Sequence, residues 1–277
     1  MPNISQADKN TLLAEIENCQ NLLNSIVLSG NNEFNFPCPI CWFGNIETEK
    51  PIIFTMGINP SCDEFIPPIP ASTPCRFRGM GLGNITDSSL YDAYNGYFSG
   101  ASANPYGKWF SMLQRRVTDA GIDGCFHSKE DKQYKYQLVH VDLFPFATDP
   151  KWSELVKKYG ANNPIIKQCI NAGNTLLHKL IQICQPKAII SFGAYRDKVK
   201  YLNISSISAG PCPAASHPAN SSSGIKYPHA NSDGYTIRIG KYCNIPIILT
   251  SGCVEFFETK ADYKAVLAEI GRIFHQL

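Results

Sequence analysis

The stretch Pro51-Ile-Ile-Phe-Thr-Met-Gly-Ile-Asn-Pro-Ser61 is the strongest indication of the fold. Residues 52–56 form an apolar run rich in β-branched and aromatic side chains, which predicts a buried strand. Gly57 allows a close approach of the backbone to a ligand, and Pro60 cannot continue a strand. Between them Asn59 is the only polar side chain. Ligands bind at the carboxyl ends of strands in open α/β sheets, so this turn is a candidate site, with an ordinary strand-to-loop turn as the alternative.

The composition is typical of a folded globular protein. The chain has 277 residues, of which 44% are hydrophobic and 17% charged, and a net charge of +2. A nearly neutral chain carries no bulk electrostatic sign of a nucleic-acid partner. Its first ten residues lack the apolar core of a signal peptide, and no apolar run approaches the ~18 residues of a membrane span. With eleven scattered cysteines, we predict reduced thiols, a cytoplasmic location and no membrane partner.

Strand and helix patterns alternate along the chain. They predict helices over 8–29, 104–121, 149–159, 163–185, 194–201 and from 259 onward, strands over 52–56, 138–144 and 187–193, a short strand ending near residue 216, and a hairpin of 235–239 with 245–250. Residues 62–104 are predicted to be irregular because prolines and glycines interrupt them. The alternation indicates an α/β fold, a three-layer sandwich with a central, mainly parallel sheet.

The predicted domain organisation is a single domain over 1–277. It consists of the N-terminal helix at 8–29, a core over 50–222, and an extra C-terminal hairpin and helix over 234–277. Cys38 and Cys41 form the only Cys-x-x-Cys pair. A zinc site needs four ligands, and no second closely spaced pair exists, so we do not predict a metal site there.

Three strand-end motifs stand in order: Gly57-Ile-Asn-Pro-Ser61, Asp142-Leu-Phe-Pro145 and His217-Pro-Ala-Asn220. Tyr97-Phe98 and Asn104-Pro-Tyr-Gly-Lys-Trp-Phe110 lie between the first two. Together these motifs resemble the uracil-DNA glycosylase superfamily, most closely its mismatch-specific and single-strand-selective branches. The similarity covers residues 50–222. It implies a small parallel sheet between helices, with the active site at the carboxyl ends of the strands.

The resemblance implies a role for each matched residue. Asn59 and His217 would be catalytic, Asn59 by orienting water and His217 by donating a hydrogen bond to O2 of the departing base. The base would contact Gly57, Ile58, Phe98 and Asp142, with Phe98 stacked on it. The DNA backbone would contact Ser61, Asn104, Lys108, Pro218, Asn220 and Ser221. The implied function is hydrolysis of the N-glycosidic bond of a flipped-out uracil or related deaminated base, in single- or double-stranded DNA.

The sequence departs from this family at three positions. Asp142 stands where the single-strand-selective branch has an Asn that reads uracil, and an ionised Asp can only accept hydrogen bonds. Ala219 replaces the usual Ser. Cys38, Cys41 and Cys169 match three places of the iron–sulfur branch, but Leu143 takes the fourth. We therefore expect no cluster and no other cofactor.

Two alternatives remain open. The chain could be a catalytically weak or inactive nucleic-acid or nucleobase binder of the same fold, which its near-neutral charge, Asp142 and Ala219 all fit. It could also be a hydrolase in which Ser61, Ser216 or a cysteine is the nucleophile and His217 the base. No Gly-x-Ser-x-Gly elbow is present and no acid is placed to orient His217, so this second alternative is disfavoured. We interpret His140, in the middle of a predicted strand, as structural.

Overall fold

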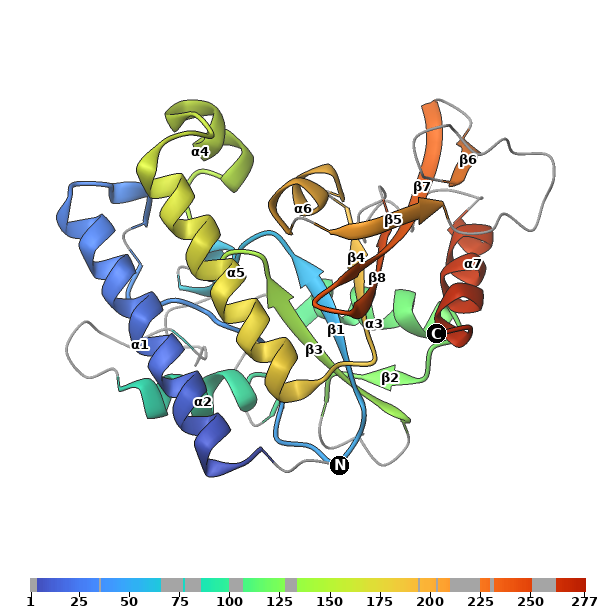
Figure 1. Cartoon of the computed structure of the whole chain (residues 1–277), viewed down its shortest axis with the longest axis horizontal. Coiled ribbons are helices and arrows are strands. Elements are labelled where there is room, and N and C mark those ends of the chain that lie inside the picture. The colour runs from blue at the N-terminus through green and yellow to red at the C-terminus, as the bar shows by residue number, and fades with distance from the viewer. Residues whose placement is uncertain are drawn as a thin grey trace.

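The computed structural model of the 277-residue chain is shown in Figure 1. It describes residues 4–34, 36–65, 77, 86–99, 107–127, 134–193, 195–202, 204–209, 225–229, 232–250 and 263–277. Helices surround a central sheet (Figure 1), so the mixed α/β class predicted from the sequence is confirmed.

In the described part of the chain, strands from both halves of the sequence form one sheet of eight strands. The strands are β1 (Ile52–Gly57), β2 (Gly124–Cys125), β3 (Tyr136–Asp142), β4 (Ala188–Phe192), β5 (Ser205–Ala209), β6 (Ile225–His229), β7 (Ser232–Tyr242) and β8 (Ile245–Thr250). In the order β2-β3-β1-β4-β8 they run parallel. Antiparallel β7 follows β8 and pairs with both β5 and β6.

The helices are α1 (Gln6–Leu28), α2 (Asp87–Asn95), α3 (Gly107–Asp119), α4 (Trp152–Tyr159), α5 (Pro164–Cys184), α6 (Tyr195–Leu202) and α7 (Tyr263–His275), with 3-10 turns η1 (Asn32–Phe34) and η2 (Cys62–Glu64). Side-chain N-caps explain where two of these helices begin. Ser5 accepts a hydrogen bond from the Asp8 amide at the start of α1, and Asn163 accepts one from the Ile165 amide at the start of α5.

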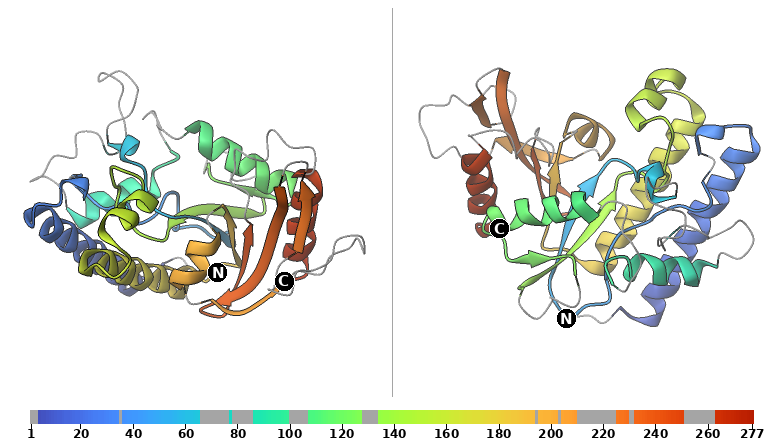
Figure 2. Two further views of the ribbon diagram at one scale, coloured as in Figure 1. Left: turned by 90° about the horizontal axis from the view of Figure 1, so that it is seen from above. Right: turned by 180° about the vertical axis from the view of Figure 1, so that it is seen from behind.

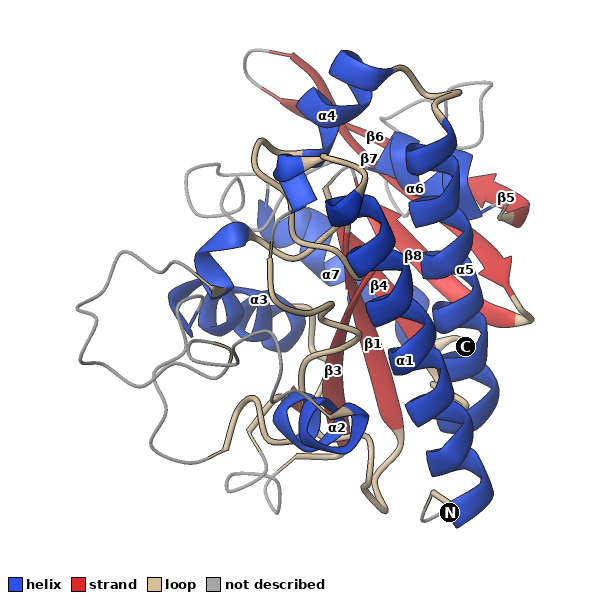
Figure 3. Cartoon of the chain, turned by 90° about the vertical axis from the view of Figure 1, so that its left-hand side faces the viewer, coloured by secondary structure: helices blue, strands red, loops and turns tan. Residues whose placement is uncertain are grey.

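The order of the strands places helices on both faces of the sheet. The chain moves from β1 outward to β3 through α3, then back across β1 to β4 through α5. Parallel crossovers are right-handed, so connections in opposite directions lie on opposite faces. Accordingly, α5 lies beside α1 on one face, and α3 lies beside α7 on the other (Figures 2 and 3). The direction reverses between β1 and β4, where open α/β sheets form a ligand-binding crevice.

Two of the predictions are wrong. The C-terminal hairpin exists as β7 and β8, but β8 also pairs in parallel with β4, so this hairpin belongs to the central sheet and is not an addition to it. The segment predicted as irregular contains α2, which starts with a capping box formed by Thr86 and Ser89 and buries Tyr91 and Tyr94. Burial of these rings in the core stabilises a helix that the neighbouring glycines and prolines concealed.

The strand predicted to end near Ser216 and the predicted helix start at residue 104 lie outside the described residues. Every residue of β3 is buried, including the polar residues Gln137, His140 and Asp142. Of the helices in the described part of the chain, none combines the length and the apolar character that crossing a membrane requires.

Candidate functional site

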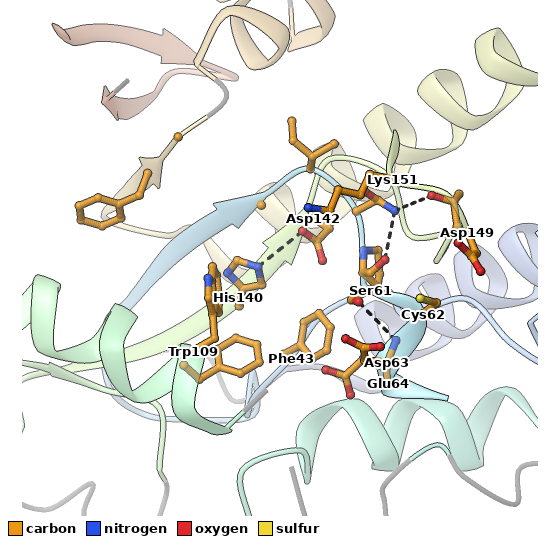
Figure 4. A pocket seen from close by; sticks show the side chains of 18 of the residues that line it. Phe43, Ser61, Cys62, Asp63, Glu64, Trp109, His140, Asp142, Asp149 and Lys151 are labelled. Carbon is orange, nitrogen blue, oxygen red and sulfur yellow. Dashed lines mark hydrogen bonds and ion pairs between the residues drawn. The ribbon is translucent and has the colours of Figure 1, made fainter. Parts of the chain in front are cut away.

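A cavity of about 700 Å³ opens at the carboxyl ends of β1, β3 and β4 (Figure 4). It is lined by Phe43, Gly57, Ile58, Asn59, Pro60, Ser61, Cys62, Asp63, Glu64, Trp109, Phe110, His140, Asp142, Thr148, Asp149, Lys151, Phe192, Gly193 and Lys198. These residues come from both sides of the point where the strand order reverses. This position and the mixture of aromatic and ionisable side chains are those of a ligand site.

Asn59 is held in place by its amide nitrogen. Nδ2 donates to the carbonyl oxygens of Pro60 and Phe146, at 3.1 and 3.3 Å, and to Oγ1 of Thr148 at 3.2 Å. Carbonyl oxygens only accept hydrogen bonds, so the nitrogen and not Oδ1 must face them. Oδ1 accepts no hydrogen bond from the described residues. It is therefore available to a molecule in the cavity.

His140 and Asp142 lie on the same side of β3, because strand side chains alternate. Nδ1 of His140 is 2.9 Å from Oγ1 of Thr55, and Nε2 is 3.5 Å from Oδ1 of Asp142. If the Thr55 hydroxyl donates to Nδ1, the proton of the neutral ring is on Nε2 and points toward Asp142. His140, which the sequence led us to interpret as structural, is therefore part of the cavity wall.

Gly57 is required for a different reason from the one suggested by the sequence. A Cβ atom at this position would lie 2.0 Å from Oδ1 of Asp142 and 3.0 Å from Nε2 of His140. The space beside Gly57 is therefore filled by these two side chains and not by a ligand.

Lys198 extends from α6 into the floor of the cavity and is only 1% exposed. Its Nζ lies 2.6–3.3 Å from the carbonyl oxygens of Met56, Phe192 and Gly193 and from Oγ of Ser191. Burial lowers the pKa of Lys198 to about 7, and attraction to the charges of Asp142 and Asp197 opposes this change. The lysine thus joins the carboxyl ends of β1 and β4 beneath the cavity.

Glu64 ends the short turn η2 and is 2% exposed. The hydroxyl of Tyr97 donates to its Oε1 at 2.7 Å, whereas Oε2 is buried without a hydrogen-bond partner among the described residues. Burial raises the pKa of Glu64 to about 8 against the opposing hydrogen bond from Tyr97, and repulsion from Asp142 and Asp63 adds to the rise. At neutral pH this carboxyl group is therefore mostly protonated.

Aromatic rings form one wall of the cavity. Trp109 and Phe110 come from α3, and Phe43 packs beside them, with its ring centroid 5.4 Å from that of Phe110. Phe98, predicted to stack on a base, does not line the cavity. Its ring packs edge-on against Phe110, with the ring centroids 4.9 Å apart, and in a tilted arrangement against Phe126 at 4.8 Å. The aromatic rings that face the cavity are instead those of Phe43, Trp109 and Phe110.

The structure brings five of the predicted site residues together around the cavity: Gly57, Ile58, Asn59, Ser61 and Asp142. Phe98 lies behind the wall, and Lys108 is exposed on α3 and does not line the cavity. The remaining predicted residues, Asn104, His217, Pro218, Asn220 and Ser221, lie outside the described residues.

His140, Glu64 and Lys198 line the cavity but were not among the predicted site residues. The spacing of two between His140 and Asp142 places both side chains on one face of a strand, and this signal could have identified His140. For Glu64 and Lys198 no local pattern distinguishes a buried charged side chain from a solvated one, because their partners are distant in sequence.

Three cysteine thiols in the described part of the chain do not have the properties of nucleophiles. Burial raises the pKa of Cys62, which lines the cavity, and the negative charges of Asp63 and Asp149 raise it further. Burial also raises the pKa of Cys38 and of Cys169 to about 12. Nucleophilic cysteines require the opposite change in pKa. Within the described residues, no three His, Cys, Asp or Glu side chains are grouped so that they could hold a metal ion.

Neither protein-family models nor curated protein sequences include a match to this chain.

Proposed function

We propose that this protein is a DNA glycosylase-like hydrolase that receives a flipped-out base in the cavity and cleaves its N-glycosidic bond. The observation that carries the proposal is the orientation of Asn59. Its amide nitrogen is fixed by Phe146 and Thr148, and its Oδ1 is left to accept a hydrogen bond from a water molecule. The ordered motifs around Asn59, Asp142 and His217 support the same proposal by their resemblance to the uracil-DNA glycosylase superfamily.

The charges around the cavity suit this reaction. Breaking the bond leaves positive charge on the sugar and negative charge on the base, so catalysis depends mainly on stabilising the separated charges. Asp63, Asp142 and Asp149 line the cavity and would attract the sugar cation. Asn59 cannot remove a proton from water, but an electrophilic sugar needs little help beyond a correctly placed water molecule. The proton that water loses on adding to the sugar neutralises the negative charge of the departing base, so the reaction balances without a cofactor.

The base itself would be held by stacking. Phe43, Trp109 and Phe110 supply aromatic surface, and stacking on aromatic side chains contributes about 1–3 kcal/mol per base. In this proposal His217 keeps its expected role as a donor to O2 of the leaving base. DNA is the proposed partner.

A nucleobase- or nucleic-acid-binding protein without turnover is the second candidate. The observation that favours it also concerns Asn59: three hydrogen bonds from Nδ2 join the loop after β1 to the loop after β3, as a purely structural asparagine would. Catalysis and binding therefore have to be measured separately.

Replacing Asn59 by alanine is expected to reduce base excision roughly 100-fold or more, because the attacking water loses its acceptor. The assay uses labelled single- and double-stranded DNA containing uracil, hypoxanthine or a thymine mismatch, with alkali to cleave the abasic product. DNA affinity, measured by fluorescence anisotropy, is expected to change little. His217→Ala is expected to lose excision as well.

Thr148→Val is the matched control for Asn59→Ala. It removes one of the three hydrogen bonds that Nδ2 donates and leaves Oδ1 of Asn59 unchanged. We expect it to lose much less activity than Asn59→Ala, because the carbonyl oxygens of Pro60 and Phe146 still hold Nδ2. Equal losses in the two variants would mean that Asn59 acts through loop structure only. If the folded wild-type protein excises none of the bases yet binds DNA, the binder replaces the glycosylase.

A further inference from the structure

Glu64 has an arrangement that structural packing does not require. One carboxyl oxygen accepts the hydrogen bond from Tyr97, and the other is buried with no partner among the described residues. A buried polar atom without a hydrogen bond costs about 1–3 kcal/mol. Because the side chain lines the cavity, a bound molecule is the natural partner for Oε2.

Asp142 is a second buried carboxyl group of the same cavity. Repulsion from Asp142 is one of the causes that raise the pKa of Glu64, after burial. A protonated Glu64 can donate a hydrogen bond, and a carboxyl oxygen of Asp142 can accept one, so the two groups can act as a donor and an acceptor in one site.

Asp142 also has one carboxyl oxygen without a hydrogen-bond partner among the described residues. Its Oδ1 lies beside Nε2 of His140, while Oδ2 accepts no hydrogen bond from the described residues. Asp142 enters the cavity from β3 and Glu64 from η2 (Figure 4). The cavity therefore offers one free O–H donor, on Glu64, and one free carboxylate acceptor, on Asp142.

We propose that Glu64 and Asp142 together recognise a lactam group, with the Glu64 hydroxyl donating to a carbonyl oxygen of the base and Asp142 accepting from a ring N–H. This inference rests on the proposed function, because it assigns the recognition of the base in the same cavity. Uracil and hypoxanthine carry such a carbonyl and N–H. In cytosine and adenine an amino group replaces that carbonyl and the neighbouring ring nitrogen is an acceptor, which reverses the hydrogen-bonding pattern.

The pair also accounts for the aspartate at position 142. An ionised Asp142 alone would repel a carbonyl oxygen of the base. With Glu64 as the donor to the carbonyl, Asp142 needs only to accept from N–H. An amide side chain is then no longer needed to supply both interactions, and Glu64 becomes a residue that determines specificity.

The test measures binding of free uracil and hypoxanthine to the full-length protein by calorimetry, from neutral to moderately alkaline pH. The charged and titratable groups that line the cavity together with Glu64 are Cys62, Asp63, His140, Asp142, Asp149, Lys151 and Lys198, and Tyr97 contacts Glu64 directly. Above the pKa of Glu64 the protonated fraction falls tenfold for each pH unit. Affinity for both bases is therefore expected to fall as the pH rises through about 8.

Glu64→Gln is the matched variant, because the amide keeps a hydrogen-bond donor but does not titrate. It is expected to bind uracil at neutral pH. Its affinity should no longer decrease as the pH rises through the range in which Glu64 of the wild-type protein loses its proton. Titration of the ligand itself affects both proteins equally, so the comparison isolates Glu64. 3-Methyluracil lacks the N–H that Asp142 would accept, and we expect it to bind at least tenfold more weakly than uracil.

Tyr97→Phe provides a second test if the glutamine variant does not fold. The Tyr97 hydrogen bond lowers the pKa of Glu64, so its removal is expected to move the fall in affinity to higher pH. The inference is overturned if wild-type and Glu64→Gln proteins have the same pH dependence, if Tyr97→Phe leaves the midpoint unchanged, or if 3-methyluracil binds as tightly as uracil. It is also overturned if the folded wild-type protein binds neither base. Excision that depends on Asn59 would leave the proposed function standing in each of these cases.

Discussion

Replacing Gly173 by alanine is expected to lower the free energy of unfolding by about 3 kcal/mol, at the upper end of the usual cost of overpacking. Gly173 lies in the interior of α5, where helix propensity alone would make alanine more stable by up to about 1 kcal/mol. A Cβ atom at this position would be 1.9 Å from the carbonyl oxygen of Leu143. That oxygen belongs to the backbone and cannot rotate away, so the helix or the end of β3 must move.

Chemical denaturation monitored by circular dichroism measures this effect. Thr175→Ala is the control, because Thr175 is exposed on the same helix and such surface substitutions change stability by about 0.5 kcal/mol or less. Leu143 directly follows Asp142, so the displacement is also expected to weaken uracil binding. An unchanged or higher stability of Gly173→Ala would mean that α5 can move away from this strand end at little cost.

Replacing Lys198 by methionine is expected to lower the free energy of unfolding by about 3 kcal/mol at alkaline pH. Methionine fills a similar volume but leaves the carbonyl oxygens of Met56, Phe192 and Gly193 without the Nζ donor. Each buried acceptor that loses its partner costs about 1–3 kcal/mol, and partial relaxation of the loops offsets some of the total.

The loss is expected to depend on pH in a defined direction. The folded protein releases the Lys198 proton near pH 7, whereas the unfolded chain holds it until about pH 10.5. Between these values the unfolded state binds more protons, so Lys198 stabilises the wild-type protein increasingly as the pH rises. Below about pH 7 both states are protonated and burial of the charge is unfavourable. The difference in free energy of unfolding between wild type and Lys198→Met should therefore be smallest at acidic pH and should grow between about pH 7 and about pH 10.5.

Lys200→Met is the matched control, because Lys200 is an exposed lysine on the same helix. Its stability is expected to follow the wild-type curve at every pH. A difference between wild type and Lys198→Met that stays constant from acidic to alkaline pH would show that Lys198 keeps the same protonation state in the folded and unfolded chains.

The sequence predicted those parts of the fold that depend on local patterns. β1, α1 and α5 followed from the apolar spacing of residues 52–56, 8–29 and 163–185. The place of β8 in the central sheet could not be predicted from the sequence. The hairpin is a local signal, whereas the parallel pairing of β8 with β4 joins segments far apart in the chain. Helix α2 was missed because its tyrosines gain their stability from burial, which a local pattern does not contain.

The candidate site was predicted in the same uneven way. Asn59 and Asp142 stood out because each follows or ends a buried strand. Glu64 and Lys198 depend on Tyr97 and Met56, which are 33 and 142 residues away. A charged side chain is expected at the surface unless distant partners bury it, so only the three-dimensional arrangement reveals these two groups.

The central place of β1 has a consequence for hydrogen exchange. β1 pairs with β3 on one side and β4 on the other, so its amide protons should exchange only in rare openings that approach global unfolding. Asn59, two residues beyond this strand, is therefore anchored to the most persistent part of the chain. The amides of Asp63 and Glu64 lie in a single short turn and should exchange through local openings that leave Asn59 in place.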